Sequence, residues 1–147
     1  MAHVRKQIRD AIKTALTGLP TTGNSVHATR VFPIERLSLP ALVIYTKSED
    51  VNFDTLTINR SVMRNLEVMV EAYVSGSNPH DDELDIIAVD VEEALAADNT
   101  LGGLTKDLQV TAFEADYTGD GEQIVGIGRF TVAVVYRTAE NDVETAA

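Results

Sequence analysis

Cysteine is absent from this chain of 147 residues. The protein therefore has no disulfide, no thiolate ligand for zinc and no thiol nucleophile, and its stability must come from packing or from neighbouring subunits. No apolar run approaches the roughly 18 to 20 residues that a membrane-spanning helix needs. The first residues form an amphipathic segment, unlike the charged and then apolar pattern of a signal peptide. We therefore expect a soluble protein that the general secretory route does not export.

Basic residues are few. The chain has 12 Lys and Arg against 23 Asp and Glu, a formal net charge of -11. Affinity for nucleic acid comes mainly from the neutralisation of phosphates, so this balance argues against direct binding to DNA or RNA. With 44% hydrophobic residues the chain is long enough for one domain with a real core, and short for two.

Two segments have apolar residues at helical spacing. Residues 3–19 are expected to form a first helix, ended by Gly18 and Pro20, with basic side chains among its other positions: Arg5, Lys6, Arg9 and Lys13. Residues 80–98 are expected to form a second helix that buries Leu84, Ile87, Val91, Ala94 and Leu95. The other face of this second helix carries eight acidic residues and no Lys or Arg. The exposed sides of the two helices are thus opposite in charge.

The remaining apolar runs have the character of strands. They predict strands over residues 26–32, 41–46, 62–74, 107–117 and 123–138. Two helices on one face of a mostly antiparallel sheet of four to five strands make an α+β two-layer sandwich. We expect this domain to span residues 1–139, and the small and acidic residues 140–147 to form a disordered tail.

The segment KSEDVNFDTLTINRS, residues 47–61, has weak periodicity and lies between two strands. It is interpreted either as a long loop or as a projecting hairpin. Long loops in compact domains are uncommon and often functional. If the segment projects, four apolar residues have no evident core to enter: Val51, Phe53, Leu56 and Ile58. We expect these residues to contact a partner, and the segment to be mobile alone and ordered on docking.

The glycine-rich stretch DYTGDGEQIVGIGRF begins at Asp116. Its acidic residues Asp116, Asp120 and Glu122 alternate with glycines as in a cation-binding loop. The stretch lacks, however, the twelve-residue order of oxygen ligands that a calcium loop requires. Gly and Asp are also what a tight turn requires, so a hairpin is favoured. Gly126 and Gly128 lack a following helix that would point amides at a phosphate, and they favour a bulge or a close backbone approach.

Other titratable residues form no convincing catalytic set. The second helix begins with one imidazole and several carboxylates, which in principle are enough to hold a metal: His80, Asp81, Asp82 and Asp85. Acidic residues in the first turn of a helix ordinarily serve the helix dipole instead. Glu67 and Glu71 share one strand face and would act as acid and base only in a cleft. We expect no enzyme, no catalytic residue, no bound metal and no cofactor.

Several stretches carry a resemblance to a known family. They are LPALVIYT, the junction from the second helix to LGGLTKDL, and the terminal run from GEQ to YRT. In their order along the chain they resemble the tail terminator proteins of long-tailed phages, the family of the lambda minor tail protein U. The likeness extends from about Val4 to Thr138, and its motifs are structural in type.

The resemblance implies a mixed sheet with helices on one side and a sixfold ring as the working form. Such a ring caps the completed tail tube at the head-proximal end of the tail in the virion, stops tube polymerisation and presents a surface for joining the head. The implied partners are other copies of the chain, the major tail tube protein and a head connector or neck protein. A domain of this length is about 35 to 40 Å wide, so six would enclose a bore of about 35 Å. DNA would pass through this bore without specific binding, because an acidic lining repels phosphate.

The opposite charges of the two helices suit a head-to-tail contact between subunits. In such a contact Arg5, Arg9 and Lys13 of one subunit would meet the acidic residues of the next, Asp82, Asp85, Glu92 and Glu93. Two solvated helix faces explain the charges equally well. Two other functions remain open: a head-completion or neck protein, and a small-molecule-binding domain, whose sign would be a deep pocket with convergent polar groups.

Overall fold

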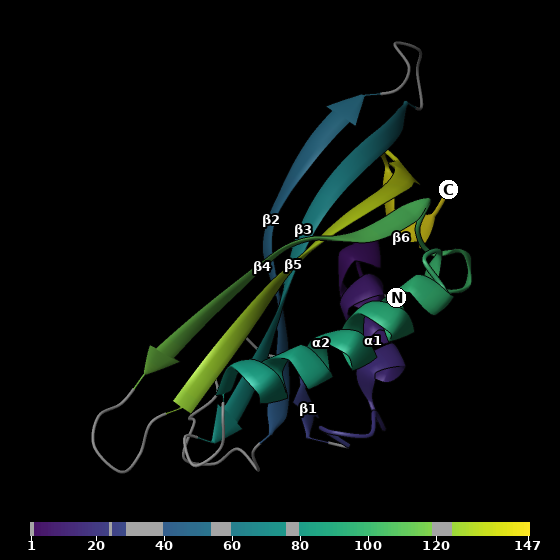
Figure 1. Ribbon diagram of the computed structural model, residues 1–147. Helices are drawn as coiled ribbons and strands as arrows, with labels where there is room; N and C mark the ends of the chain where they lie inside the picture. Colours follow the sequence, from purple (N-terminus) through teal and green to yellow (C-terminus); the bar gives the residue numbers. More distant parts are fainter. Residues whose placement is uncertain (1, 24, 29–39, 54–59, 76–79, 119–124) are drawn as a thin grey trace.

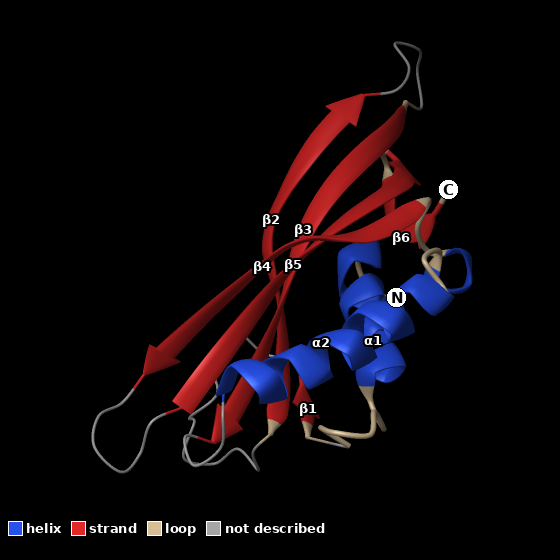
Figure 2. Ribbon diagram, in the orientation of Figure 1, coloured by secondary structure: helices blue, strands red, loops and turns tan. Residues whose placement is uncertain are grey.

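The structure, a computed structural model, describes residues 2–23, 25–28, 40–53, 60–75, 80–118 and 125–147. Its elements are α1 (Val4–Leu16), β1 (Val26–His27), β2 (Ala41–Phe53), β3 (Ser61–Ser75), α2 (His80–Ala97), the 3-10 turn η2 (Leu101–Gly103), β4 (Asp107–Thr118), β5 (Val125–Ala139) and β6 (Asp142–Ala146). Both α-helices lie on the same side of one sheet (Figures 1 and 2). Among the described residues, no helix is long and apolar enough to cross a membrane.

The sheet has six strands in the order β1-β2-β3-β5-β4, with β6 beside β5. Among the described strand pairs only β1–β2 is parallel, so the predicted α+β class with a mostly antiparallel sheet is confirmed. The sheet differs from the prediction in its strand number and in its shape. It is strongly twisted and curls around the helices as a half-barrel, rather than forming a flat layer (Figure 1). Strands of 12 to 15 residues accumulate the right-handed twist over their whole length.

Helix α1 is amphipathic in the simplest way. It buries one residue per turn, Val4, Ile8, Ile12 and Leu16. His3 caps its start, because the Nδ1 atom of His3 accepts a hydrogen bond of 3.0 Å from the backbone N–H of Arg5. The helix ends at Leu16, three residues earlier than predicted, and Gly18 follows with a φ of 87° that favours glycine.

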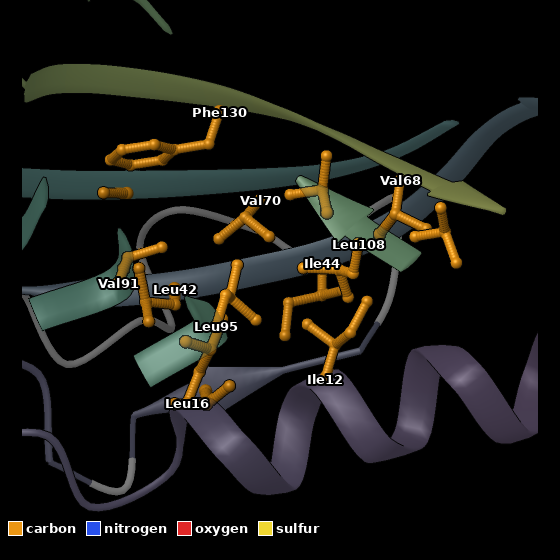
Figure 3. Close-up of a cluster of buried hydrophobic side chains, with 14 of the residues drawn as sticks. Ile12, Leu16, Leu42, Ile44, Val68, Val70, Val91, Leu95, Leu108 and Phe130 are labelled. Atoms are coloured by element: carbon orange, nitrogen blue, oxygen red, sulfur yellow. The ribbon is translucent and has the colours of Figure 1, made fainter. Parts of the chain in front are cut away.

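Helix α2 packs across α1 and completes the core. Four of its five predicted core residues are buried, Leu84, Ile87, Val91 and Leu95, and Ala94 is half-buried. Figure 3 shows residues of the two helices meeting strand residues from β2, β3, β4 and β5 in one apolar cluster. The predicted alternation in β3 is also confirmed, since Leu66, Val68, Val70, Ala72 and Val74 all lie in this cluster.

Strands β2 and β3 continue past the helices, which corrects one reading of residues 47–61. The long-loop alternative is wrong for the described part of this segment, because β2 runs to Phe53, which pairs with Val62 of β3. The projecting-hairpin alternative fits these residues; residues 54–59 lie outside the described part. A register shift between Thr46 and Ser48 places Lys47 in a bulge. This extra residue breaks the period-two pattern, which explains the weak periodicity of the sequence.

The C-terminal residues also differ from the prediction of a disordered tail. Asp142–Ala146 forms β6, which pairs with the end of β5. The backbone N–H of Ala147 donates to the carbonyl of Arg137 at 2.8 Å, and Gln7 Nε2 donates to the carbonyl of Glu144 at the same distance. The small acidic composition hid this strand, because its stability comes from backbone pairing rather than from apolar side chains. The turn residue Asn141 before Asp142 was the available signal.

Two hairpins project from opposite ends of the sheet (Figure 1). The β2–β3 arm is defined here as residues 48–53 of β2 and 60–65 of β3. The β4–β5 arm is defined as residues 111–118 of β4 and 125–131 of β5. The expected strand over residues 26–32 is described only at its start, as β1, and residues 29–39 lie outside the described part.

Candidate functional site

The β2–β3 arm presents apolar side chains to solvent. Val51 is 45% exposed and Phe53 is 51% exposed. Both lie on the side of the sheet that faces the helices, since Val51 pairs with Arg64 and Phe53 with Val62. The guanidinium carbon of Arg60 lies 4.5 Å from the centre of the Phe53 ring. Leu56 and Ile58, the other two predicted contact residues, lie outside the described residues.

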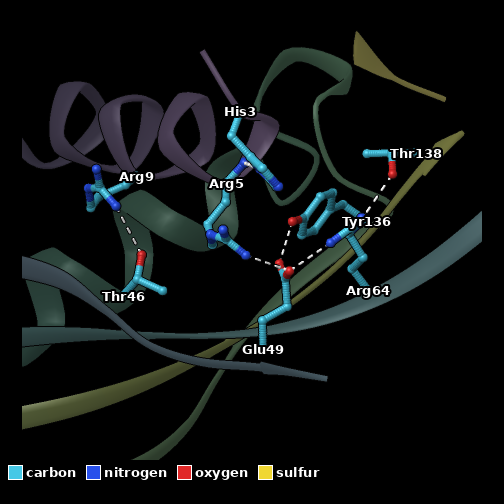
Figure 4. A network of polar contacts seen from close by, with 8 residues as sticks. All are labelled: His3, Arg5, Arg9, Thr46, Glu49, Arg64, Tyr136 and Thr138. Atoms are coloured by element: carbon cyan, nitrogen blue, oxygen red, sulfur yellow. Dashed lines mark hydrogen bonds and ion pairs between the residues drawn. The ribbon is translucent and has the colours of Figure 1, made fainter. Parts of the chain in front are cut away.

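A buried carboxylate, Glu49, anchors the base of this arm (Figure 4). Its side chain is only 6% exposed. One oxygen, Oε2, accepts from Arg5 Nη1 at 2.7 Å and from Arg64 Nη1 at 2.9 Å. The other oxygen accepts from the hydroxyl of Tyr136. Arg64 also donates through Nε to Thr138 Oγ1 at 3.1 Å. The network joins α1, β2, β3 and β5 through one carboxylate.

The Glu49 carboxylate lies among two guanidinium groups and the hydroxyl of a neutral tyrosine. Burial, and then the hydrogen bond to Glu49, raise the pKa of Tyr136 well above its usual range. Burial, followed by the nearby Arg5 charge, lowers the pKa of His3 below 6.5. A neutral His3 is what the helix cap requires, because its Nδ1 atom must accept a hydrogen bond. The network of Glu49, Arg5, Arg64 and Tyr136 is called the clamp below, because it holds α1 to the base of the β2–β3 arm.

The clamp changes the interpretation of the basic residues on α1. Arg5 is bound to Glu49, and Arg9 Nη1 donates to Thr46 Oγ1 at 3.1 Å. Both therefore face the sheet of their own chain. Lys13 is exposed, as is Lys6, which pairs with Asp10 at 2.7 Å. The structure thus divides the predicted basic face. Of the three predicted contact residues, Lys13 is the one whose exposed side chain makes no hydrogen bond or ion pair within the described part of the chain.

The acidic face of α2 is exposed as the sequence predicted. Asp82, Asp85, Glu92 and Glu93 all lie in solvent. Two large apolar residues, Ile86 and Val89, are more than half exposed among them. These two residues were not predicted from the sequence as a surface feature. Both fall outside the i, i+4 pattern of the buried residues, and this was the available signal.

The β4–β5 arm is anchored by packing instead of by charge. Phe113 of β4 stacks at 5.0 Å on Phe130 of β5, with the rings tilted by 51°. Gly128 faces the Phe113 ring so closely that a Cβ atom there would lie 2.9 Å from Phe113 Cε2 and 3.1 Å from Leu84 Cδ2. The close-approach interpretation of Gly128 is therefore confirmed. At the end of the arm the Tyr117 hydroxyl donates to Asp81 of α2 at 2.8 Å.

The helix-free face of the sheet holds a second buried carboxylate, Glu71. It accepts from Tyr45 at 2.9 Å, from Tyr73 at 2.7 Å and from Arg129 Nε at 3.0 Å. Glu67, the other member of the pair considered in the sequence, accepts from Ser48 instead. Glu71 is fully engaged by structural partners, and burial with the Glu71 hydrogen bond raises the pKa of Tyr73 above its usual range. The two carboxylates do not form an acid–base pair in a cleft.

The described residues contain no group of three His, Asp or Glu side chains placed to hold a metal ion. Asp120 and Glu122, from the candidate cation loop, lie outside the described part, and Asp116 pairs with Arg129 at 3.6 Å. A hollow of about 370 Å³ lies between the C-terminal half of α2 and the start of β4, lined by residues that include Glu92, Leu95, Asn99 and Asp107. It is open to solvent and lacks convergent buried polar groups among these residues.

Comparisons with known proteins do not assign the chain to a family. No protein-family model matches the chain, and no curated protein matches it. Among solved structures, the chain is similar to a chain of the virion of a native gene transfer agent particle, with a TM-score of 0.36 and 13% identity. The match covers 90% of this chain and 91% of that one. A likeness this slight assigns neither a family nor a function.

Proposed function

We propose that this protein is a structural component of a phage-like virion, a tail terminator that forms a ring on the end of the tail tube. In this role it stops tube polymerisation, presents the surface that joins the head, and performs no bond chemistry. Support comes from the resemblance of the sequence over about Val4 to Thr138, and from the agreement of the observed element order with the layout that the resemblance implies.

The observation that carries the proposal is the β2–β3 arm. A monomeric domain gains nothing from apolar side chains held in water on a hairpin that extends past its helices. Val51 and Phe53 are held in this way, and the buried clamp at Glu49 fixes the direction in which the arm leaves the sheet. An arm that is rigid at its base and apolar towards its tip is suited to contact with another protein.

The role of the arm is tested with a double variant, Val51→Ser with Phe53→Ser. Both side chains are half exposed, so the change should leave folding intact. We expect tails of uncontrolled length, measured by electron microscopy of particles from a virus that carries the variant. The matched control changes an exposed residue between α2 and β4, Asn99→Ser, and should give normal tails. Normal tails from the arm variant would contradict the proposal.

The neck-protein alternative predicts a different defect. Loss of a head-completion protein leaves tails of normal length that fail to join heads, whereas loss of a terminator leaves tails that are too long. Deletion of residues 50–58 removes Val51 and Phe53 together with the residues that follow them in the chain, and serves as the stronger version of the same test. Normal-length, unjoined tails in a strain without the protein would favour the neck assignment.

The predicted contact between the helices of neighbouring subunits now involves fewer basic residues. Arg5 and Arg9 belong to intramolecular contacts, so a triple reversal with Lys13 would disturb the clamp and confuse folding with assembly. Lys13→Glu alone changes an exposed residue. If Lys13 meets Asp82, Asp85, Glu92 or Glu93 of the next subunit, this variant should weaken the ring, measured as mass in solution and on tube ends. An unchanged mass would remove the charged helix faces from the contact.

A further inference from the structure

Two strands of the sheet have an open outer edge. In the order β1-β2-β3-β5-β4, β4 is the last strand and pairs with β5 alone. At the other end, among the residues that the structure describes, β1 pairs with Leu42 and Val43 of β2. Within the described part of the chain, residues 48–53 of β2 and 111–118 of β4 therefore have no strand on their outer side. On the β4 edge the backbone N–H of Tyr117 donates to Asp116 Oδ1 at 2.8 Å. Backbone N–H and C=O groups that are left unpaired on such edges are templates for another strand.

Both open edges carry exposed apolar side chains on the same face of the sheet. The described residues include six exposed large hydrophobic side chains, and four of them belong to these edges: Val51, Phe53, Phe113 and Tyr117. Val51 pairs with Arg64 of the clamp and Phe113 with Phe130 of the core, so both point to the helix side. Neither edge alone buries its apolar row, and the two rows are alike in chemistry.

The directions of the strands allow the edges to join. β2 is antiparallel to β3, β3 to β5 and β5 to β4, so β4 runs opposite to β2. When β4 of one copy lies beside β2 of a second copy with the same face turned to the helices, the two strands are antiparallel. The contact uses different edges on the two partners, so it is head-to-tail and repeats from copy to copy. Such a repeat closes into a ring when the rotation per copy permits.

We propose that the subunits of the assembly join by continuation of the sheet, with the open edge of β4 on one copy pairing antiparallel with the open edge of β2 on the next. The occupant of each edge is a second copy of this chain. This inference rests on the proposed ring and names its contact. On the helix side, Phe113 and Tyr117 then lie in one row with Val51 and Phe53, and aromatic and β-branched residues paired across strands stabilise a sheet.

The charges on the helix-free face restrict the register. Asp50 points to that face on β2, and Glu114 and Asp116 point to it on β4. A register that sets Asp50 directly opposite either carboxylate is disfavoured, because like charges facing one another destabilise a pair. Two registers avoid this: Asn52 opposite Asp116, which also sets Val51 against Tyr117, and Asp50 opposite Ala112. The same carboxylates limit pairing with unrelated edges.

Disulfide cross-linking tests the contact, and the absence of native cysteine gives a clean background. Each test protein carries two new cysteines on the helix-free face, one replacing Ser48, Asp50 or Asn52 and the other replacing Ala112, Glu114 or Asp116. Three strand spacings, about 14 Å, separate β2 from β4 within one copy. A disulfide needs Cα atoms within about 7 Å, so a bond between these positions must join two copies. The control pair, Val51→Cys with Ala112→Cys, puts its cysteines on opposite faces.

The oxidised proteins are analysed on non-reducing gels, and the unoxidised proteins by mass, both free at high concentration and bound to tubes of the same virus. A ladder of cross-linked multimers from same-face pairs of one register, and none from the control, is the expected result. Rings by mass without a ladder from any same-face pair would overturn the sheet contact and leave the capping role intact. Ladders from same-face and control pairs alike would also overturn it. If no ring forms in either condition, the proposed function fails, and this inference fails with it.

Discussion

The two arms of the sheet have similar shapes but are anchored by different chemistry. The β2–β3 arm leaves the domain at Glu49, where a carboxylate that is 6% exposed holds Arg5, Arg64 and Tyr136. The β4–β5 arm leaves it at Gly128, where a missing side chain lets Phe113 lie against the sheet and the core. A polar clamp depends on every partner being present, whereas a packed anchor depends on volume. The arms should therefore respond differently to substitution.

The largest effect is expected from Glu49→Ala. Breaking a buried ion pair by removal of one partner costs about 3 to 5 kcal/mol, because the remaining charge is left without compensation. Here Arg64 is only 12% exposed and Tyr136 also loses its acceptor, while Arg5, at 37%, recovers some hydration. The free energy of unfolding, measured by chemical denaturation, should fall by that amount.

The matched control for this variant is Glu67→Ala on the neighbouring strand. Glu67 accepts only an exposed hydrogen bond from Ser48 among the contacts described above, so its loss should stay within about 0.5 kcal/mol. A loss of less than about 1 kcal/mol for Glu49→Ala would show that the clamp does not anchor the arm.

A smaller loss is expected from Gly128→Ala at the packed anchor. The new Cβ would lie 2.9 Å from Phe113 Cε2, and Phe113 is exposed enough to shift. Leu84 is buried and has less room, so overpacking should cost about 1 to 3 kcal/mol. In a Phe113→Ala background the same substitution should cost less, which a double-mutant cycle measures. An equal cost in both backgrounds would mean that Phe113 is not what requires glycine here.

The tip of the β2–β3 arm should contribute least to folding. Arg60 lies over the Phe53 ring and pairs with Glu140 at 3.0 Å, with both charged side chains 40% exposed. Exposed pairs of this kind are worth about 0 to 1 kcal/mol. Arg60→Ala should therefore change the free energy of unfolding by no more than about 1 kcal/mol. A larger loss would mean that the contacts of Arg60 stabilise the fold in addition to the contacts of Glu49 at the base of the arm.

A final prediction concerns pH and the His3 cap of α1, which lies beside the polar clamp. His3 has a folded-state pKa below 6.5, so the unfolded chain binds its proton first as pH falls. The stability that neutral His3 contributes is therefore complete above pH 6.5 and is lost as pH falls through the folded-state pKa. His3→Ser retains a capping side chain that does not titrate. Between about pH 7.5 and pH 5 the wild type should lose more stability than this variant, measured by thermal unfolding; equal losses would contradict the assignment.

The sequence was sufficient for the parts of the fold that depend on apolar periodicity. The stripe of α1, the buried face of α2 and the alternation in β3 each follow from spacing alone, and Gly128 was correctly associated with a close approach. The class of the fold then follows from the order of elements. Strand β6 was missed because its backbone pairing leaves no apolar pattern in the sequence.

The clamp could not be predicted in the same way. Glu49 lies 44 residues from Arg5 and 87 residues from Tyr136, and the network requires the bulge at Lys47 to turn Glu49 to the helix side. Arg5 and Arg9 were interpreted as exposed basic residues because a helical pattern does not show what the sheet beside it offers. The exposure of Ile86 and Val89 could be predicted from their spacing. This face of the helix was interpreted by its charge alone, because acidic residues surround the two apolar ones.

The bulge at Lys47 also limits how the chain of this protein can change in length during evolution. After the bulge, successive side chains of β2 point to alternate faces of the sheet. Loss of that one residue would therefore exchange the two faces and turn Glu49, Val51 and Phe53 away from the helices. Additions near the tip are harmless when they come in matched pairs, one on each strand. Related chains should therefore have arms of different lengths. The number of residues between the positions of Thr46 and Phe53 should differ among them only by even numbers.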